Sequence, residues 1–117
     1  MVVCFESIRP ENVFRCRGKG GILIDVRTNE EYGTGHIPGA VNIPYEEIPK
    51  RIEEIRQLTR PQMSGRSAFL ILYCEHGNTS MKASRDLYRL GFSVKNVFGG
   101  LHEYHGPLVK TAEQSHR

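Results

Sequence analysis

Short apolar runs alternate along this chain with segments that have helical periodicity. The predicted strands lie at residues 4–7, 22–26, 40–42, 68–73 and 94–98. The runs at 22–26 and 68–73 are the most continuous, which is typical of strands buried on both faces of a parallel sheet. Strands that alternate with helices in this way predict an α/β fold with a mainly parallel sheet.

The segments between the apolar runs predict helices. These segments cover residues 10–17, 28–32, 45–58, 80–90 and 101–104. Pro10 suits a first helical turn, and Thr28 suits an N-cap. In the third segment, Ile48, Ile52 and Ile55 have helical spacing, so Pro49 must lie in the first turn or mark the start of the helix. Residues 60–67 read as a polar loop, and we expect the polar tail after Pro107 to fray.

Length and composition bound the kind of protein. The chain has 117 residues, 38% of them hydrophobic, which is enough for one domain that needs no disulfide or metal to fold. We predict a single domain over residues 1–106 and a polar C-terminal tail over 107–117. No apolar run reaches the roughly 18–20 residues of a membrane span. The net charge of +3 is spread among acidic residues, which argues against a nucleic-acid-binding face.

The three cysteines, Cys4, Cys16 and Cys74, indicate the redox environment. Their odd number and wide spacing predict neither a disulfide framework nor a zinc site. Residues 1–7 lack the basic segment and long apolar run of a signal peptide. We therefore expect a reducing intracellular location, in which a free thiol survives, with the cytoplasm as the default and an organelle as the alternative.

The segment at residues 73–80 carries the candidate chemistry, because it leaves the most apolar strand and enters a helix. Ligands of parallel α/β sheets bind outside the carboxyl ends of strands, where a helix start offers unpaired N–H groups. Cys74 would face these donors, which stabilise a thiolate. Small residues and a flexible Gly-Asn pair leave room for an anion on the sulfur. The predicted substrate site around Cys74 is Glu75, His76, Gly77, Asn78, Thr79 and Ser80.

A plainer interpretation of the same position stays open. A single cysteine at a strand end also serves as a small buried hydrophobic residue.

Three segments together resemble the rhodanese, or thiosulfate sulfurtransferase, family. Asp-Val-Arg at 25–27, Glu-Tyr at 31–32 and the run Gly-His-Ile-Pro-Gly-Ala-Val-Asn-Ile-Pro at 35–44 are similar to its N-terminal signature. Residues 73–80 resemble its active-site loop. Val-Phe-Gly-Gly at 97–100, with Tyr104, resembles its double glycine and following aromatic residue. The resemblance covers about residues 5–105.

The resemblance implies a five-stranded, mainly parallel sheet with helices on both faces. It also implies that Cys74 takes a sulfane sulfur from thiosulfate or another small donor and becomes a persulfide. The sulfur then passes to cyanide or to a thiol acceptor, either a small thiol or a thioredoxin-like protein. The family chemistry requires no metal and no organic cofactor. The mixed charge and the lack of a long apolar run predict no nucleic-acid and no membrane partner.

Two positions depart from the family pattern. Active members commonly carry Arg where this chain has Thr79, and small or basic residues where it has Glu75. Thr offers an oxyanion one hydroxyl, whereas Arg offers a bidentate contact. We therefore expect thiosulfate to be a poor donor, and a bulkier or less charged donor to react faster. The alternative is a catalytically silent rhodanese module that binds a partner. A related phosphatase or arsenate reductase needs Arg where this chain has Ser80, which argues against that activity.

Residues outside the loop have mainly structural interpretations. We predict that Asp25 and Arg27 form an ion pair at a strand-to-helix turn, and that His36 orders its loop by hydrogen bonds. Lys82 lies near enough to a helix start to add positive potential. His102 is a candidate for the rim of the pocket, and its HxxH spacing with His105 does not favour a metal site.

Overall fold

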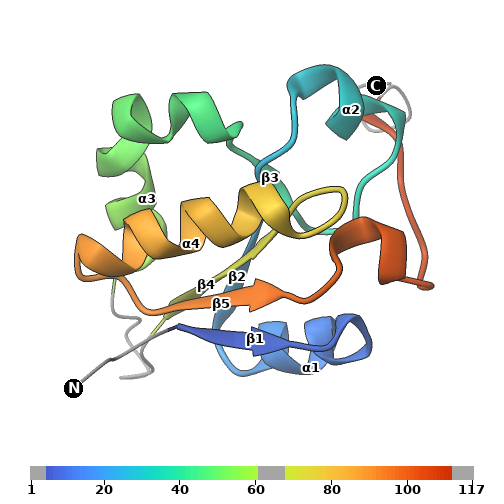
Figure 1. Ribbon diagram of the computed structural model, residues 1–117, viewed down its shortest axis with the longest axis horizontal. Coiled ribbons are helices and arrows are strands. Elements are labelled where there is room, and N and C mark those ends of the chain that lie inside the picture. Colours follow the sequence, from blue (N-terminus) through green and yellow to red (C-terminus); the bar gives the residue numbers. More distant parts are fainter. Residues whose placement is uncertain (1–4, 61–67, 112–117) are drawn as a thin grey trace.

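Parallel strands form the central layer of the computed structural model, which describes residues 5–60 and 68–111 (Figure 1). The sheet has five strands in the order β1-β5-β4-β2-β3, and every neighbouring pair is parallel. The strands are β1 (Glu6–Ile8), β2 (Gly21–Asp25), β3 (Val41–Asn42), β4 (Phe69–Tyr73) and β5 (Val94–Val97). The predicted α/β fold with a mainly parallel sheet is confirmed.

Helices connect the strands and cover both faces of the sheet (Figure 1). They are η1 (Pro10–Asn12), α1 (Val13–Gly18), α2 (Asn29–Thr34), η2 (Tyr45–Arg51), α3 (Ile52–Leu58), α4 (Asn78–Arg89) and η3 (Gly100–Glu103). The start of the first predicted strand at Cys4 and the predicted loop at 61–67 lie outside the described residues.

Alternation along β4 divides the core into two layers. Leu70 and Leu72 pack on one face with residues of α3 and α4, and Ile71 and Tyr73 pack on the other face with Val13 of α1. Cys74 continues the first set, because side chains at every second position share a face. The strand therefore delivers the cysteine to the side that α4 covers.

The prediction of one continuous α-helix over residues 45–58 is wrong. The segment is a 3₁₀ helix, η2, followed by the α-helix α3, and the chain changes direction between them (Figure 1). Pro49 lies inside η2, not in the first turn of an α-helix. Proline has no N–H for the α-helical hydrogen bond, and its ring crowds the preceding turn. Ile48 and Ile55 are buried all the same, so the apolar spacing still marks the inner side.

Small side chains form the buried face of α4. This face consists of Ser80, Ala83, Ser84 and Leu87, whereas Met81 and Leu90 are 43% and 53% exposed. Residues three and four apart share a helix face, so this set forms one stripe against the sheet. The short side chains let the helix, and with it the loop before it, lie close to β4 and β5.

The chain after Pro107 does not fray at once. Val109 forms an antiparallel bridge with His36, in which each N–H donates to the partner's carbonyl at 2.9 Å. Residues up to Thr111 are thereby held against the domain, which corrects the expected fraying from residue 107. Among residues 5–60 and 68–111, no helix has the length and apolar character needed to cross a membrane.

Candidate functional site

The site is built around Cys74, the residue that follows β4. Its Sγ accepts hydrogen bonds from two main-chain amides, Gly77 N–H at 3.0 Å and Ser80 N–H at 3.2 Å. Gly77 is the N-cap of α4 and has a left-handed backbone with φ of +102°. This conformation costs glycine nothing, and it turns the loop so that both N–H groups point at one atom. The start of α4 therefore surrounds the sulfur with hydrogen-bond donors.

The double glycine before η3 holds the same loop from the other side. Leu101 N–H donates to the Cys74 carbonyl at 2.8 Å, and His102 N–H donates to the Glu75 carbonyl at 2.9 Å. Gly100 has φ of +63°, and a Cβ there would overlap the Cys74 carbonyl oxygen and lie 2.7 Å from that of Glu75. Only glycine permits this close approach, so the third family-like segment serves to place the first residues of the loop.

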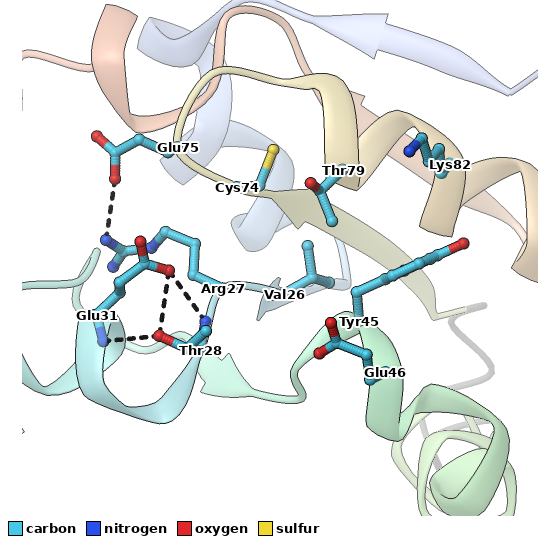
Figure 2. Close-up of a pocket in the computed structure, with 10 residues that line it drawn as sticks. All are labelled: Val26, Arg27, Thr28, Glu31, Tyr45, Glu46, Cys74, Glu75, Thr79 and Lys82. Atoms are coloured by element: carbon cyan, nitrogen blue, oxygen red, sulfur yellow. Dashed lines mark hydrogen bonds and ion pairs between the residues drawn. The ribbon is translucent and has the colours of Figure 1, made fainter.

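Cys74 lies between the core and a cavity of about 430 Å³ (Figure 2). The residue is only 4% exposed and packs with the apolar cluster under α4, yet it also lines the cavity. The lining consists of Val26, Arg27, Thr28, Glu31, Tyr45, Glu46, Cys74, Glu75, Thr79 and Lys82. The side chain is thus shielded from bulk water and open to a small ligand.

Arg27 connects three segments around the cavity. Its guanidinium binds the buried carboxylate of Asp25 at 2.9 Å, the Gly35 carbonyl at 2.6 Å and the Glu75 carboxylate at 3.2 Å. Burial opposes ionisation, but hydrogen bonding and charge attraction to Asp25 outweigh it, so the pKa of Arg27 lies above its ordinary value. The predicted ion pair between Asp25 and Arg27 is confirmed.

The contact with Arg27 decides the orientation of Glu75. Figure 2 shows its carboxylate turned toward Arg27 and away from the Cys74 sulfur. The negative charge of Glu75 is therefore not directed at the Cys74 sulfur. Its charge still belongs to the cavity wall, and Arg27, already paired with Asp25, compensates it only in part.

The remaining charges of the lining come from three elements. Glu31 closes a capping box with Thr28, donating its N–H to Thr28 Oγ1 at 3.1 Å and receiving the Thr28 N–H at 3.2 Å. Lys82 and Glu46 take part in no ion pair among the described residues. Figure 2 shows Lys82 on α4, with Thr79 between it and Cys74. Among the described residues that line the cavity, Lys82 is thus the cation without an ion-pair partner.

The structure brings most, but not all, of the predicted site residues together. Cys74, Glu75 and Thr79 line the cavity, and Gly77 and Ser80 hold the sulfur through their N–H groups. His76 and Asn78 are exposed and do not line it.

The histidines singled out in the sequence lie outside the cavity lining. The His76 ring packs against the His102 ring, with ring centroids 5.0 Å apart. His36 is fully buried, stacks on Tyr32 and hydrogen-bonds its carbonyl through Nδ1 at 2.8 Å, as expected for a loop-ordering residue.

Several contributors to the site were not predicted from the sequence, among them Val26, Thr28 and Glu31 of the cavity lining. Tyr45 and Glu46 reach the cavity from η2, far upstream of the cysteine. Asn96, on β5, accepts a hydrogen bond from the Ser80 hydroxyl at 2.6 Å. The sequence contains little signal for Asn96, because its strand reads Val-Lys-Asn-Val and two of the four residues are polar.

Comparisons with known proteins agree with this geometry. A rhodanese-like domain matches residues 13–106 of the chain. The chain is 35% identical over 97 residues to thiosulfate sulfurtransferase GlpE of Pseudomonas syringae, covering 82% of this chain and 83% of that protein. It is 30% identical over 93 residues to adenylyltransferase and sulfurtransferase UBA4 of Meyerozyma guilliermondii, covering 79% of this chain but only 22% of that longer protein.

A solved structure shows the same fold. The rhodanese-like domain protein from Staphylococcus aureus superposes with a TM-score of 0.74 at 27% identity, covering 91% of this chain and 98% of that one. Similarity to relatives named sulfurtransferases supports sulfur transfer as the general activity. With its matching sequence segments, parallel sheet and cysteine loop, the chain belongs to the rhodanese-like domain family.

Proposed function

We propose that this protein is a sulfurtransferase that carries a sulfane sulfur on Cys74. The observation that carries the proposal is the pair of main-chain N–H groups, from Gly77 and Ser80, at 3.0 and 3.2 Å from Sγ. Such donors stabilise a thiolate and the persulfide that replaces it, at no cost in reorganisation.

The chemistry needs two displacements at sulfur. In the first, the Cys74 thiolate attacks the sulfane sulfur of the donor, and the bond between that sulfur and its carrier breaks. With thiosulfate, the products are a Cys74 persulfide anion and sulfite. In the second, cyanide or a thiolate attacks the outer sulfur, so that thiocyanate or a new persulfide leaves and the Cys74 thiolate returns. The cavity is large enough for a small donor to reach the sulfur.

The charges of the cavity wall favour a donor that carries less charge than thiosulfate. Three carboxylates, from Glu31, Glu46 and Glu75, line the cavity with two cations, Arg27 and Lys82. Arg27 is already paired with buried Asp25, so among the described lining residues Lys82 alone faces the entering anion without a counter-charge. Thr79 offers no positive charge. We therefore propose a small thiol-borne sulfane donor, such as a low-molecular-weight persulfide, in preference to the thiosulfate dianion.

Intact-mass spectrometry tests the proposal. The reduced protein is incubated with thiosulfate or with cysteine persulfide, which carries less negative charge, then separated from excess donor, and its intact mass is measured. We expect a gain of one sulfur atom, larger in yield with cysteine persulfide, that is absent from Cys74→Ser and kept in the control Cys16→Ser. The addition of cyanide should remove the sulfur and release thiocyanate. An absence of adduct with both donors would contradict sulfur transfer and favour a silent binding module.

A further inference from the structure

Asn96 of β5 is a buried polar residue whose contacts lead to the nucleophile. The side chain is 1% exposed, and its Oδ1 accepts a hydrogen bond from the Ser80 hydroxyl at 2.6 Å. Ser80 Oγ in turn lies 3.4 Å from Cys74 Sγ, and the Ser80 N–H donates to the same sulfur. The amide is therefore two hydrogen bonds away from the reacting atom.

The observed contacts fit the protonated thiol. A serine hydroxyl has one proton to donate and lone pairs that accept. Here the proton goes to Asn96, while Ser80 Oγ accepts from the Cys74 S–H group. Within the described part of the chain, the only other acceptor bonded to that hydroxyl is the Gly77 carbonyl, at a longer 3.3 Å.

The thiolate needs the opposite arrangement. A sulfur anion has no proton, so Ser80 must donate to it, and Ser80 Oγ then needs a donor of its own. Asn96 meets both requirements, because a half-turn of its amide replaces Oδ1 by the Nδ2 donor. The bond to Ser80 is the only side-chain hydrogen bond of Asn96 within residues 5–60 and 68–111, so this turn breaks no other. An aspartate can only accept, and a leucine can do neither.

We propose that Asn96 is a positioning residue that sets the direction of the Ser80 hydroxyl. In one amide orientation Ser80 accepts from the thiol, and in the other it gives the thiolate a third donor beside the Gly77 and Ser80 amides. The inference rests on the proposed function only in taking Cys74 as the nucleophile. It extends the site from the loop to β5, to a buried residue that does not line the cavity.

The test follows alkylation of Cys74 by iodoacetamide across pH, resolved peptide by peptide so that other cysteines do not interfere. Loss of a hydrogen bond to a charged sulfur is worth about tenfold in the thiol–thiolate equilibrium, which moves the midpoint of the rate profile by about one pH unit. We expect this upward shift for Ser80→Ala and at least as large a shift for Asn96→Asp. Asn96→Leu should shift the midpoint upward by less than Ser80→Ala, because it removes the donor to Ser80 Oγ but leaves the Ser80 proton available to the sulfur.

The double variant Ser80→Ala/Asn96→Asp distinguishes an effect transmitted through the Ser80 hydroxyl from direct electrostatic repulsion between the new carboxylate and the thiolate. If Asn96→Asp acts through Ser80, its effect should shrink when Ser80 is already alanine. An equal shift with and without the Ser80 hydroxyl would show direct repulsion by the new carboxylate and would overturn the inference. The charged groups that face the cavity are the same in every variant; they are Arg27, Glu31, Glu46, Glu75 and Lys82.

Ser84→Ala is the matched control. Ser84 is also a buried serine of α4, and its hydroxyl has no partner among the described residues. Its removal should leave the midpoint in place. If Asn96→Asp does not fold, as judged by thermal melting, Ser80→Ala and Asn96→Leu still test the inference, and an unchanged midpoint in Asn96→Leu overturns it. Alkylation uses no sulfur donor, so a failed sulfur-transfer assay leaves this test intact.

Discussion

At the scale of single residues, Thr79 and Lys82 determine how the site meets a negative charge. Both line the cavity on the side of α4, and only Lys82 carries a positive charge there. A lysine is a flexible point charge, whereas an arginine holds two oxyanion oxygens at once. The identity of these two residues therefore sets which sulfur donors react well.

Replacement of Thr79 by arginine should improve thiosulfate as a donor. The new guanidinium would give the thiosulfate oxygens a charge-assisted contact, and we expect kcat/KM to rise about tenfold. Steady-state thiocyanate formation from thiosulfate and cyanide measures the effect. Cysteine persulfide, which carries less negative charge than thiosulfate, should gain less, and an equal gain with both donors would contradict the charge argument.

Loss of the Lys82 ammonium should have the opposite effect. Lys82→Met is expected to lower kcat/KM for thiosulfate about two- to fivefold, as for a partly exposed ion contact, and less at high salt. Arg85→Met is the control, because Arg85 is an exposed cation of the same helix that does not line the cavity. If both variants lose activity alike, the effect belongs to overall charge and not to the site.

At the scale of elements, η3 and the double glycine place the cysteine loop. The loop carbonyls of Cys74 and Glu75 receive N–H groups from the start of η3, and Gly100 lies too close to them for any side chain. Two elements far apart in the chain therefore fix the direction in which the sulfur's amide donors point.

Gly100→Ala tests this role of η3. The added Cβ must displace the loop carbonyls, so we expect a loss of about 1–3 kcal/mol of unfolding free energy and slower Cys74 alkylation. Gly91→Ala is a matched control, since Gly91 also has positive φ, +99°, but a Cβ there would meet no atom of the described residues within 4 Å. Urea unfolding and alkylation rates measure both. Slower alkylation in Gly91→Ala to the same extent would show that backbone strain alone explains the result.

At the scale of the whole molecule, the buried ion pair of Asp25 and Arg27 joins separate parts of the chain. Arg27 contacts β2 through Asp25, the segment after α2 through Gly35, and the cysteine loop through Glu75. The guanidinium of Arg27 therefore contributes both to the stability of the fold and to the geometry of the site.

Arg27→Met should destabilise the protein strongly. It leaves the carboxylate of Asp25, which is 0% exposed, without its cation, and breaking such a pair costs about 3–5 kcal/mol. Arg51→Met is the comparison, because Arg51 also binds two carboxylates, those of Glu47 and Glu54, but at a partly exposed site worth about 1 kcal/mol or less. Thermal or urea unfolding gives both values. Equal losses would mean that burial of the Asp25 pair has no special importance.

The sequence was sufficient to predict those features whose physical cause lies in neighbouring residues. Continuous apolar runs predicted β2 and β4, and Thr28 caps α2 as its residue type suggests. The position of Cys74 between a buried strand and a helix followed from the same patterns, because strand burial and helix capping depend on neighbouring residues. The sequence analysis gave Pro49 too little weight when it predicted one helix over residues 45–58. Its missing N–H disfavours a regular α-helix, and the segment around it is the 3₁₀ helix η2.

Only the tertiary structure decided which distant side chains meet at the sulfur. Glu75 points toward Arg27 because β2 and β4 are adjacent, Tyr45 and Glu46 reach the cavity from η2, and Asn96 reaches Ser80 from β5. These contacts join residues far apart in the chain, and no periodicity in one sequence encodes such pairings. The sequence by itself determined a parallel α/β domain with a cysteine at a strand end, and packing determined the charges and hydrogen bonds around that cysteine.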